Sequence, residues 1–149
     1  MVDLLIALQG LQVLFLWLHD WVPVPPLNDV AAVRAEDGTA KLARTTLIQA
    51  APWTIGLVAS AYFAKVGFPP WLRCWLWVSY GLLFAGEIRA WWSPYLVEAE
   101  PARAARYRRL FGRTASFLPQ RNGMAPNTLH CLLHACTLAT LLVLAWVSI

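Results

Sequence analysis

Long apolar runs separated by short polar connections dominate the pattern along the chain. Four of these runs have about the 20 residues that a helix needs to cross a bilayer: residues 2–18, 42–66, 70–92 and 126–149. They do not alternate between apolar and polar positions, as the strands of a membrane barrel would. The pattern therefore predicts a single-domain, all-α integral membrane protein with four transmembrane helices in a compact antiparallel bundle.

The connections between the runs predict how the helices are joined. Only residues 67–69 separate the second and third runs, so these two helices are expected to form a tight hairpin. In the first connection, a short helix is predicted to start after Asn28 or Asp29 and to end near Gly38. A second short helix begins at Pro101, and four of its residues share an apolar face flanked by arginines: Ala104, Tyr107, Leu110 and Phe111. We expect both short helices at the membrane interface, the second on anionic headgroups.

The distribution of charge predicts the orientation of the chain. Eight of its 12 Lys and Arg residues fall in the connections after the first and third runs, and Arg44 lies just inside the second run on the same side, whereas only Lys65 and Arg73 lie on the opposite side. The positive-inside rule places these connections in the cytoplasm and both termini on the non-cytoplasmic side. Membrane orientation accounts for the basic charge, so the expected partner is a bilayer with anionic cytoplasmic headgroups and not a nucleic acid. A homo-oligomer or a larger membrane complex stays open.

Composition supports the membrane class. The chain is 59% hydrophobic and 13% charged, whereas about 25% of the residues in a soluble domain are charged. Its three cysteines lie inside the apolar runs without C-x-x-C spacing, which favours small buried residues over a disulfide framework.

Polar residues inside the apolar runs form one layer in the predicted topology. A polar side chain in a membrane helix needs a partner or a hydrated cavity. His19 and Glu87 lie near the cytoplasmic ends of their runs, and Gln49, His130 and His134 lie where the other two runs leave the cytoplasm. The sequence therefore predicts a His/Glu polar layer at the cytoplasmic side.

Four interpretations of this layer follow from its residue types. His130 and His134 lie one helical turn apart and can bind one divalent metal ion, with Glu87 or His19 as a further ligand. A b-type haem held between His19 and one of the pair is the second cofactor hypothesis. Without any cofactor, Glu87 and His19 provide acid–base catalysis. In the structural alternative, the histidines only hydrogen-bond to neighbouring carbonyl groups or to Glu87.

Arg89 is a separate candidate. Residues two apart on a helix point about 200° apart, so Glu87 and Arg89 are not expected to pair. Arg89 either reaches headgroup phosphates or, together with Gln49, orients a substrate. The aromatic residues that follow are expected to form an interfacial belt: Trp91, Trp92 and Tyr95.

These observations lead to two functional hypotheses, beside a third, a proton- or ion-conducting path, for which the opposite half of the bundle offers few titratable residues. In the first, the chain is a small membrane enzyme or redox protein that acts on a lipid-like or quinone-like molecule. In the second, it is a non-catalytic accessory or assembly subunit of a larger membrane complex, and the polar layer serves helix packing. The sequence contains no Gly-rich phosphate loop and no nucleophile elbow, and its pattern does not identify a substrate.

Overall fold

The computed structural model describes residues 1–148, which form helices joined by turns. Over this range there is no β-strand, only an isolated bridge between Arg121 and Met124. The prediction of an all-α fold is confirmed. Four helices are long: α1 (Val2–Leu18), α3 (Thr39–Phe63), α4 (Pro70–Glu87) and α7 (Thr128–Ser148). They begin and end within a few residues of the predicted runs, except that α4 stops early. The last residue of the fourth run, Ile149, lies outside the described range.

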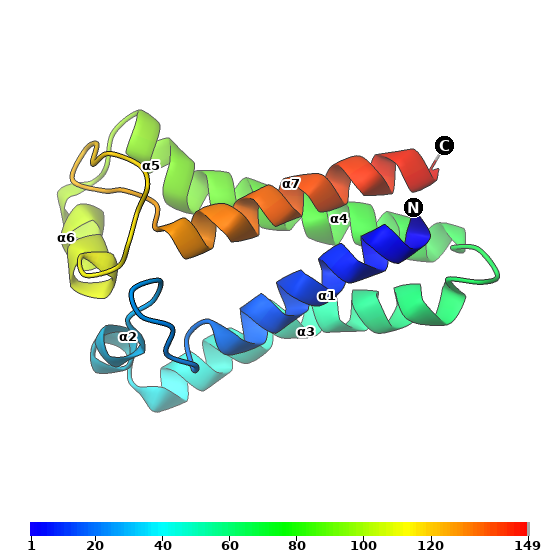
Figure 1. The fold of residues 1–149 in the computed structure, drawn as a ribbon, viewed down its shortest axis with the longest axis horizontal. Coiled ribbons are helices and arrows are strands. Elements are labelled where there is room, and N and C mark those ends of the chain that lie inside the picture. The colour runs from blue at the N-terminus through cyan, green and yellow to red at the C-terminus, as the bar shows by residue number, and fades with distance from the viewer. Residues whose placement is uncertain (149) are drawn as a thin grey trace.

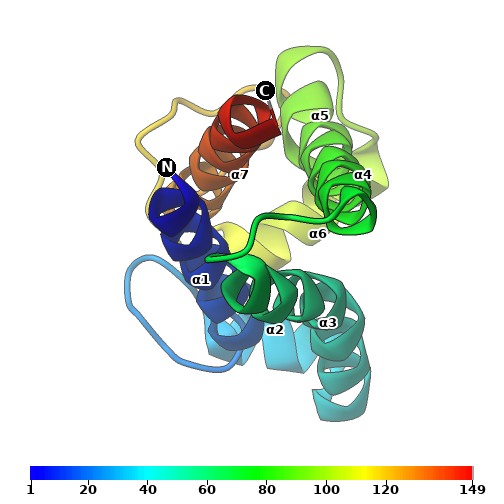
Figure 2. The ribbon, with the colours of Figure 1, turned by 90° about the vertical axis from the view of Figure 1, so that its right-hand side faces the viewer.

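The four long helices lie side by side and alternate in direction, with α1 and α4 running one way and α3 and α7 the other (Figure 1). Viewed from one end, they surround a common centre, where α1 and α4 each pack against both α3 and α7 (Figure 2). A cluster of buried apolar side chains fills the end near the chain termini: Leu5, Phe68, Leu72, Leu76, Tyr80 and Leu144. The other end holds the polar residues.

A short turn joins α3 to α4, as predicted. Gly67 in this turn has a φ of +89°, a conformation that residues with a side chain rarely adopt. Farther along the hairpin, a Cβ atom at Gly56 would lie 3.3 Å from a methyl group of Leu76. Glycine at this position therefore allows α3 to pack closely against α4.

Two short helices, α2 (Val30–Asp37) and α6 (Pro101–Phe111), pack against each other at the end where α1 finishes and α7 begins (Figure 1). Asp29 caps α2, because its Oδ1 atom accepts a hydrogen bond of 3.0 Å from the backbone N–H of Ala32. Gly38 ends the helix with a φ of +71°. Both predicted boundaries of α2 are therefore confirmed.

Ion pairs join α2 to α6 and to the turn that follows it. The arginine side chains donate hydrogen bonds of 2.8–2.9 Å to carboxylates in three pairs: Arg106 to Asp37, Arg109 to Glu36, and Arg113 to Asp29. The sequence interpretation assigned the arginines of this helix to lipid headgroups. Two of the three that flank its apolar face, Arg106 and Arg109, are instead paired within the protein.

By length and composition, one helix in residues 1–148 is long and apolar enough to cross a membrane, namely α7. The first helix, α1, is also apolar but has only 17 residues. The other two long helices do not meet the same criterion of length and hydropathy.

The end of α4 differs from the single helix predicted over residues 70–92. After Glu87 the chain forms a π-helical turn, η1 (Ile88–Trp92), followed by the short helix α5 (Ser93–Leu96). In η1 the backbone N–H of Ser93 donates to the carbonyl of Ile88, five residues earlier. Pro94 explains this wider turn, because it has no N–H to donate and its ring would clash with the carbonyl of Ala90 in a regular α-helix. The insertion redirects the side chains that follow Glu87.

Candidate functional site

A cavity of about 380 Å³ lies between the long helices, toward the end that carries α2 and α6. Its lining includes five of the six residues selected from the sequence: His19, Gln49, Glu87, His130 and His134. The rest of the lining is largely apolar and includes three aromatic side chains: Phe15, Trp53 and Trp91. An apolar pocket with a few converging polar groups is typical of a small-molecule site.

Glu87 is the buried carboxylate of this cavity, with 6% of its surface exposed. Its Oε1 atom accepts a hydrogen bond of 2.7 Å from the hydroxyl group of Thr137 on α7. The same hydroxyl oxygen accepts a hydrogen bond of 2.7 Å from the side-chain amide of Gln12 on α1. Thr140 in turn donates to Oε1 of Gln12 at 3.3 Å. This network holds one oxygen of Glu87 between three helices.

The second oxygen of Glu87, Oε2, is buried and has no hydrogen-bond partner within residues 1–148. Leaving a buried polar atom unpaired costs about 1–3 kcal/mol, and more when the group is charged. Glu87 lines the cavity, and no protein group within residues 1–148 satisfies its Oε2 atom.

The tautomer of His134 is set by Trp92. The indole N–H of Trp92 donates to Nδ1 of His134 at 3.0 Å. An indole nitrogen is only a donor, so Nδ1 must act as the acceptor, and a neutral His134 carries its proton on Nε2. The nitrogen left for a ligand is therefore a hydrogen-bond donor.

His130 has the opposite tautomer. The Oδ1 atom of Asn127 accepts both the backbone N–H of His130 at 2.9 Å and its ring nitrogen Nδ1 at 2.6 Å. The amide nitrogen of Asn127 points the other way and donates to the carbonyl of Leu27 at 3.4 Å. Nδ1 of His130 must therefore carry the proton, and its Nε2 atom is an unprotonated acceptor.

His19 lies beside Asp20 and contacts it through its ring. Its Nδ1 atom donates to the carbonyl of Phe15 at 2.9 Å, and its Nε2 atom lies 3.2 Å from Oδ2 of Asp20. Both ring nitrogens face acceptors, so either the imidazole or the carboxyl group holds the extra proton. Burial raises the pKa of Asp20, an effect that the neighbouring His19 opposes. The pair is therefore a proton-holding group at one side of the cavity.

Two of the aromatic residues after Glu87 contact the histidines of the site, and their predicted role in an interfacial belt stays a prediction. The ring of Trp91 lies 4.2 Å from that of His130 at an angle of 33°, and Trp92 bonds to His134. Tyr95 is also buried, with 4% of its surface exposed. The π turn explains the two contacts with the histidines, because it directs two consecutive tryptophans toward α7.

The described residues do not form the predicted metal site. In residues 1–148, no group of three or more His, Cys, Asp or Glu residues is placed to hold a metal ion. The ring centres of His130 and His134 lie 6.3 Å apart, and the free nitrogen of a neutral His134, Nε2, carries a proton and so is not available as a metal ligand. The residues also do not fit a haem between His19 and His130, because these rings meet edge to face at 5.8 Å. That contact leaves no flat slot for a porphyrin.

Arg89 does not line the histidine cavity, so the structure separates it from the predicted site. It lines a second cavity of about 380 Å³ between η1 and α6. Trp91 lies in the lining of both cavities. This separation agrees with the sequence-based expectation that residues two apart on a helix point about 200° apart.

Sequence reasoning did not assign the two residues that set the histidine tautomers. Asn127 carries a recognisable signal, since asparagine just before an apolar helix favours the N-cap position, from which it reaches His130. Trp92 carries no such signal, because its direction depends on the π turn.

Comparison with protein-family models, curated proteins and solved structures found no match for the chain.

Proposed function

We propose that this chain is a four-span membrane protein whose histidine cavity binds a lipid-like or quinone-like molecule and exchanges protons with it. In this proposal α1, α3, α4 and α7 cross the bilayer, and α2 and α6 lie on the cytoplasmic side. Both termini then lie on the non-cytoplasmic side, as the excess of basic residues in the two longer connections favours.

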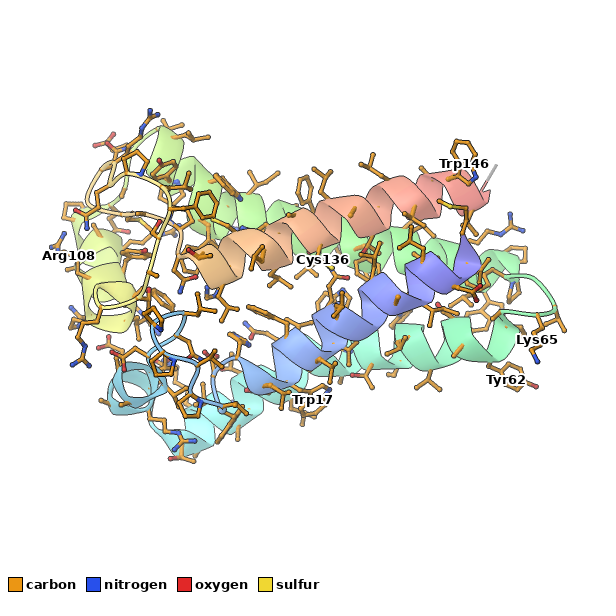
Figure 3. The ribbon with its side chains drawn as sticks, in the orientation of Figure 1. Trp17, Tyr62, Lys65, Arg108, Cys136 and Trp146 are labelled. Carbon is orange, nitrogen blue, oxygen red and sulfur yellow. The ribbon has the colours of Figure 1, made fainter. Side chains whose placement is uncertain are left out.

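The exposed surface of the long helices supports this topology. Large apolar side chains cover the outward faces of all four, including Leu14 on α1, Ile55 on α3, Leu82 on α4 and Leu142 on α7. Tyr62 and Trp146 point away from the helices near the end that carries the chain termini (Figure 3). The polar side chains Gln12, Thr137 and Glu87 lie inside. A polar interior with an apolar exterior is the arrangement expected in lipid.

The observation that carries the proposed activity is the unpartnered Oε2 atom of Glu87 beside two histidines of opposite tautomer. Glu87 and Nε2 of His130 are acceptors, whereas Nε2 of His134 is a donor. A molecule whose polar head carries a hydroxyl group and a second oxygen that accepts a hydrogen bond matches this set. The aromatic rings of Phe15, Trp53 and Trp91 suit a planar ring, which favours a quinone-like head.

The chemistry that these residues supply is proton transfer. A hydroxyl group bound between Glu87 and His130 loses its proton to one of these acceptors, while His134 donates a hydrogen bond to a neighbouring oxygen. The His19–Asp20 pair holds a further proton at the cavity wall.

Equilibrium binding of a short-chain alkyl hydroquinone to the full chain in detergent tests the proposal. We expect saturable binding that weakens about tenfold or more in Glu87→Gln and His134→Ala, as the loss of a hydrogen bond to a charged or polar group implies. Gln9→Met is the matched control, because it removes a buried polar group of α1 that does not line the cavity.

The accessory-subunit hypothesis predicts a different result. If the hydroquinone does not bind to the wild-type chain, or if these substitutions change only thermal stability, the polar residues serve helix packing and the proposed activity is wrong.

A further inference from the structure

The second cavity combines an apolar floor with a basic rim. Its floor contains Trp91, Leu110, Phe111 and Met124, and its rim carries three arginines: Arg89, Arg103 and Arg106. Cavities of this kind match molecules that have an anionic head and an apolar body. The proposed hydroquinone site does not use any of these arginines.

Pro94 explains why two of the arginines meet at this rim. The carbonyl of Arg89 has no backbone donor, because Ser93 donates to Ile88 and the next residue, Pro94, has no N–H. Arg103 of α6 satisfies this carbonyl with its own guanidinium, at 3.2 Å. The contact holds α6 against η1 and brings the side chain of Arg103 to the cavity that Arg89 lines.

The rim arginines differ in whether they form an ion pair within the protein. Arg106 forms a bidentate pair with Asp37 of α2. Within residues 1–148, neither Arg89 nor Arg103 forms an ion pair, and both are exposed. Glu98 and Glu100 line a neighbouring pocket with both arginines, but neither carboxylate forms an ion pair with them within residues 1–148. The fork of N–H donors on each of these two arginines matches the oxygens of a phosphate group.

We infer that this cavity binds the phosphate headgroup of an anionic phospholipid, with Arg89 and Arg103 as its ligands and Trp91 and Phe111 against the adjoining apolar part. The inference rests on the proposed membrane topology, which places α6 beside the cytoplasmic leaflet, where anionic lipids are concentrated. It does not depend on the chemistry proposed for Glu87.

Native mass spectrometry of the full chain with dioctanoyl phosphatidylglycerol tests this inference. We expect one retained lipid in the wild type and affinity about tenfold lower in Arg89→Gln or Arg103→Gln. Arg108→Gln is the matched control, because Arg108 lies on the same helix, does not line the cavity and points away from the long helices (Figure 3). Glu87→Gln should leave lipid binding unchanged, which separates this test from that of the hydroquinone site.

Three results would overturn the inference. Equal losses in Arg108→Gln and Arg89→Gln would mean general attraction to a basic surface. Equal retention of dioctanoyl phosphatidylcholine would show that the net charge of the head is not recognised. Inorganic phosphate that displaces the lipid at equal concentration would assign the site to a free phosphate compound.

Discussion

The indole N–H of Trp92 lies 3.0 Å from Nδ1 of His134, and this contact joins the π turn of η1 to α7. It fixes which nitrogen of His134 carries the proton. One turn earlier, Asn127 fixes the opposite tautomer of His130. The cavity therefore presents one donor and one acceptor from two neighbouring histidines, and a single hydrogen bond to each decides this arrangement.

Nitrogen NMR of histidine-labelled protein tests the tautomers directly. We expect the neutral His134 to be protonated on Nε2 and the neutral His130 on Nδ1. Trp92→Phe removes the donor to His134, so this histidine should become a mixture of tautomers while His130 keeps its own. Identical tautomers in the wild-type protein would contradict this account of the site.

The two buried glutamines of α1 should respond to substitution in opposite directions. Both amide atoms of Gln9 are buried without a partner within residues 1–148, whereas Gln12 bonds to Thr137 and Thr140. Gln9→Met removes unpaired polar atoms and should stabilise the protein by about 1 kcal/mol or more. Gln12→Met leaves both threonines without their partner and should destabilise it by about 1–3 kcal/mol. Thermal unfolding of both variants in one detergent measures the contrast.

Acid should weaken the contact between α2 and α6. The hydrogen bond from Arg109 is the main reason that the pKa of Glu36 lies below its usual value of 4.5. A carboxyl group with a lowered pKa in the folded state contributes stability above its unfolded pKa, and this contribution disappears as the pH falls through the folded pKa. We therefore expect the melting temperature to fall below about pH 4.5. The fall should be smaller in Arg109→Gln, and an identical pH profile in this variant would contradict the role of the pair.

Pro94 and Arg103 should be energetically coupled. Arg103 satisfies a carbonyl of η1 that has no backbone donor because of Pro94. Pro94→Ala supplies a backbone N–H, so Arg103→Ala should destabilise this variant less than it does the wild type. A double-mutant cycle should give a coupling of about 0.5–1 kcal/mol. Additive effects of the two substitutions would show that the carbonyl does not depend on Arg103.

Sequence periodicity predicted most of the fold and much of the site. The apolar runs located the long helices. The position of the polar residues along these runs predicted a common layer, and five of these residues line one cavity: His19, Gln49, Glu87, His130 and His134. These features depend on local spacing, which a sequence displays. The π turn does not follow from spacing alone, and the contacts of Trp91 and Trp92 with the histidines depend on it.

Contacts between distant segments were the other part that the sequence did not reveal. The basic face of α6 and the acidic residues of α2 lie far apart in the sequence. Arg106 and Asp37, for example, are separated by 69 positions. Each segment alone resembles a solvated or lipid-facing helix. Only the packing of α2 against α6 shows that these charges neutralise one another.

Photolabelling with a short-chain azidoquinone tests the central claim most directly, because it locates the ligand. In the full chain, we expect label on the cavity lining, within residues 82–91 and 130–134, and loss of that label in the presence of excess hydroquinone. Glu87→Gln should reduce the labelling, and Gln9→Met should not. Label confined to outward residues such as Ile55 and Leu142, and unaffected by hydroquinone, would contradict the claim that Glu87 and the histidines form a binding site.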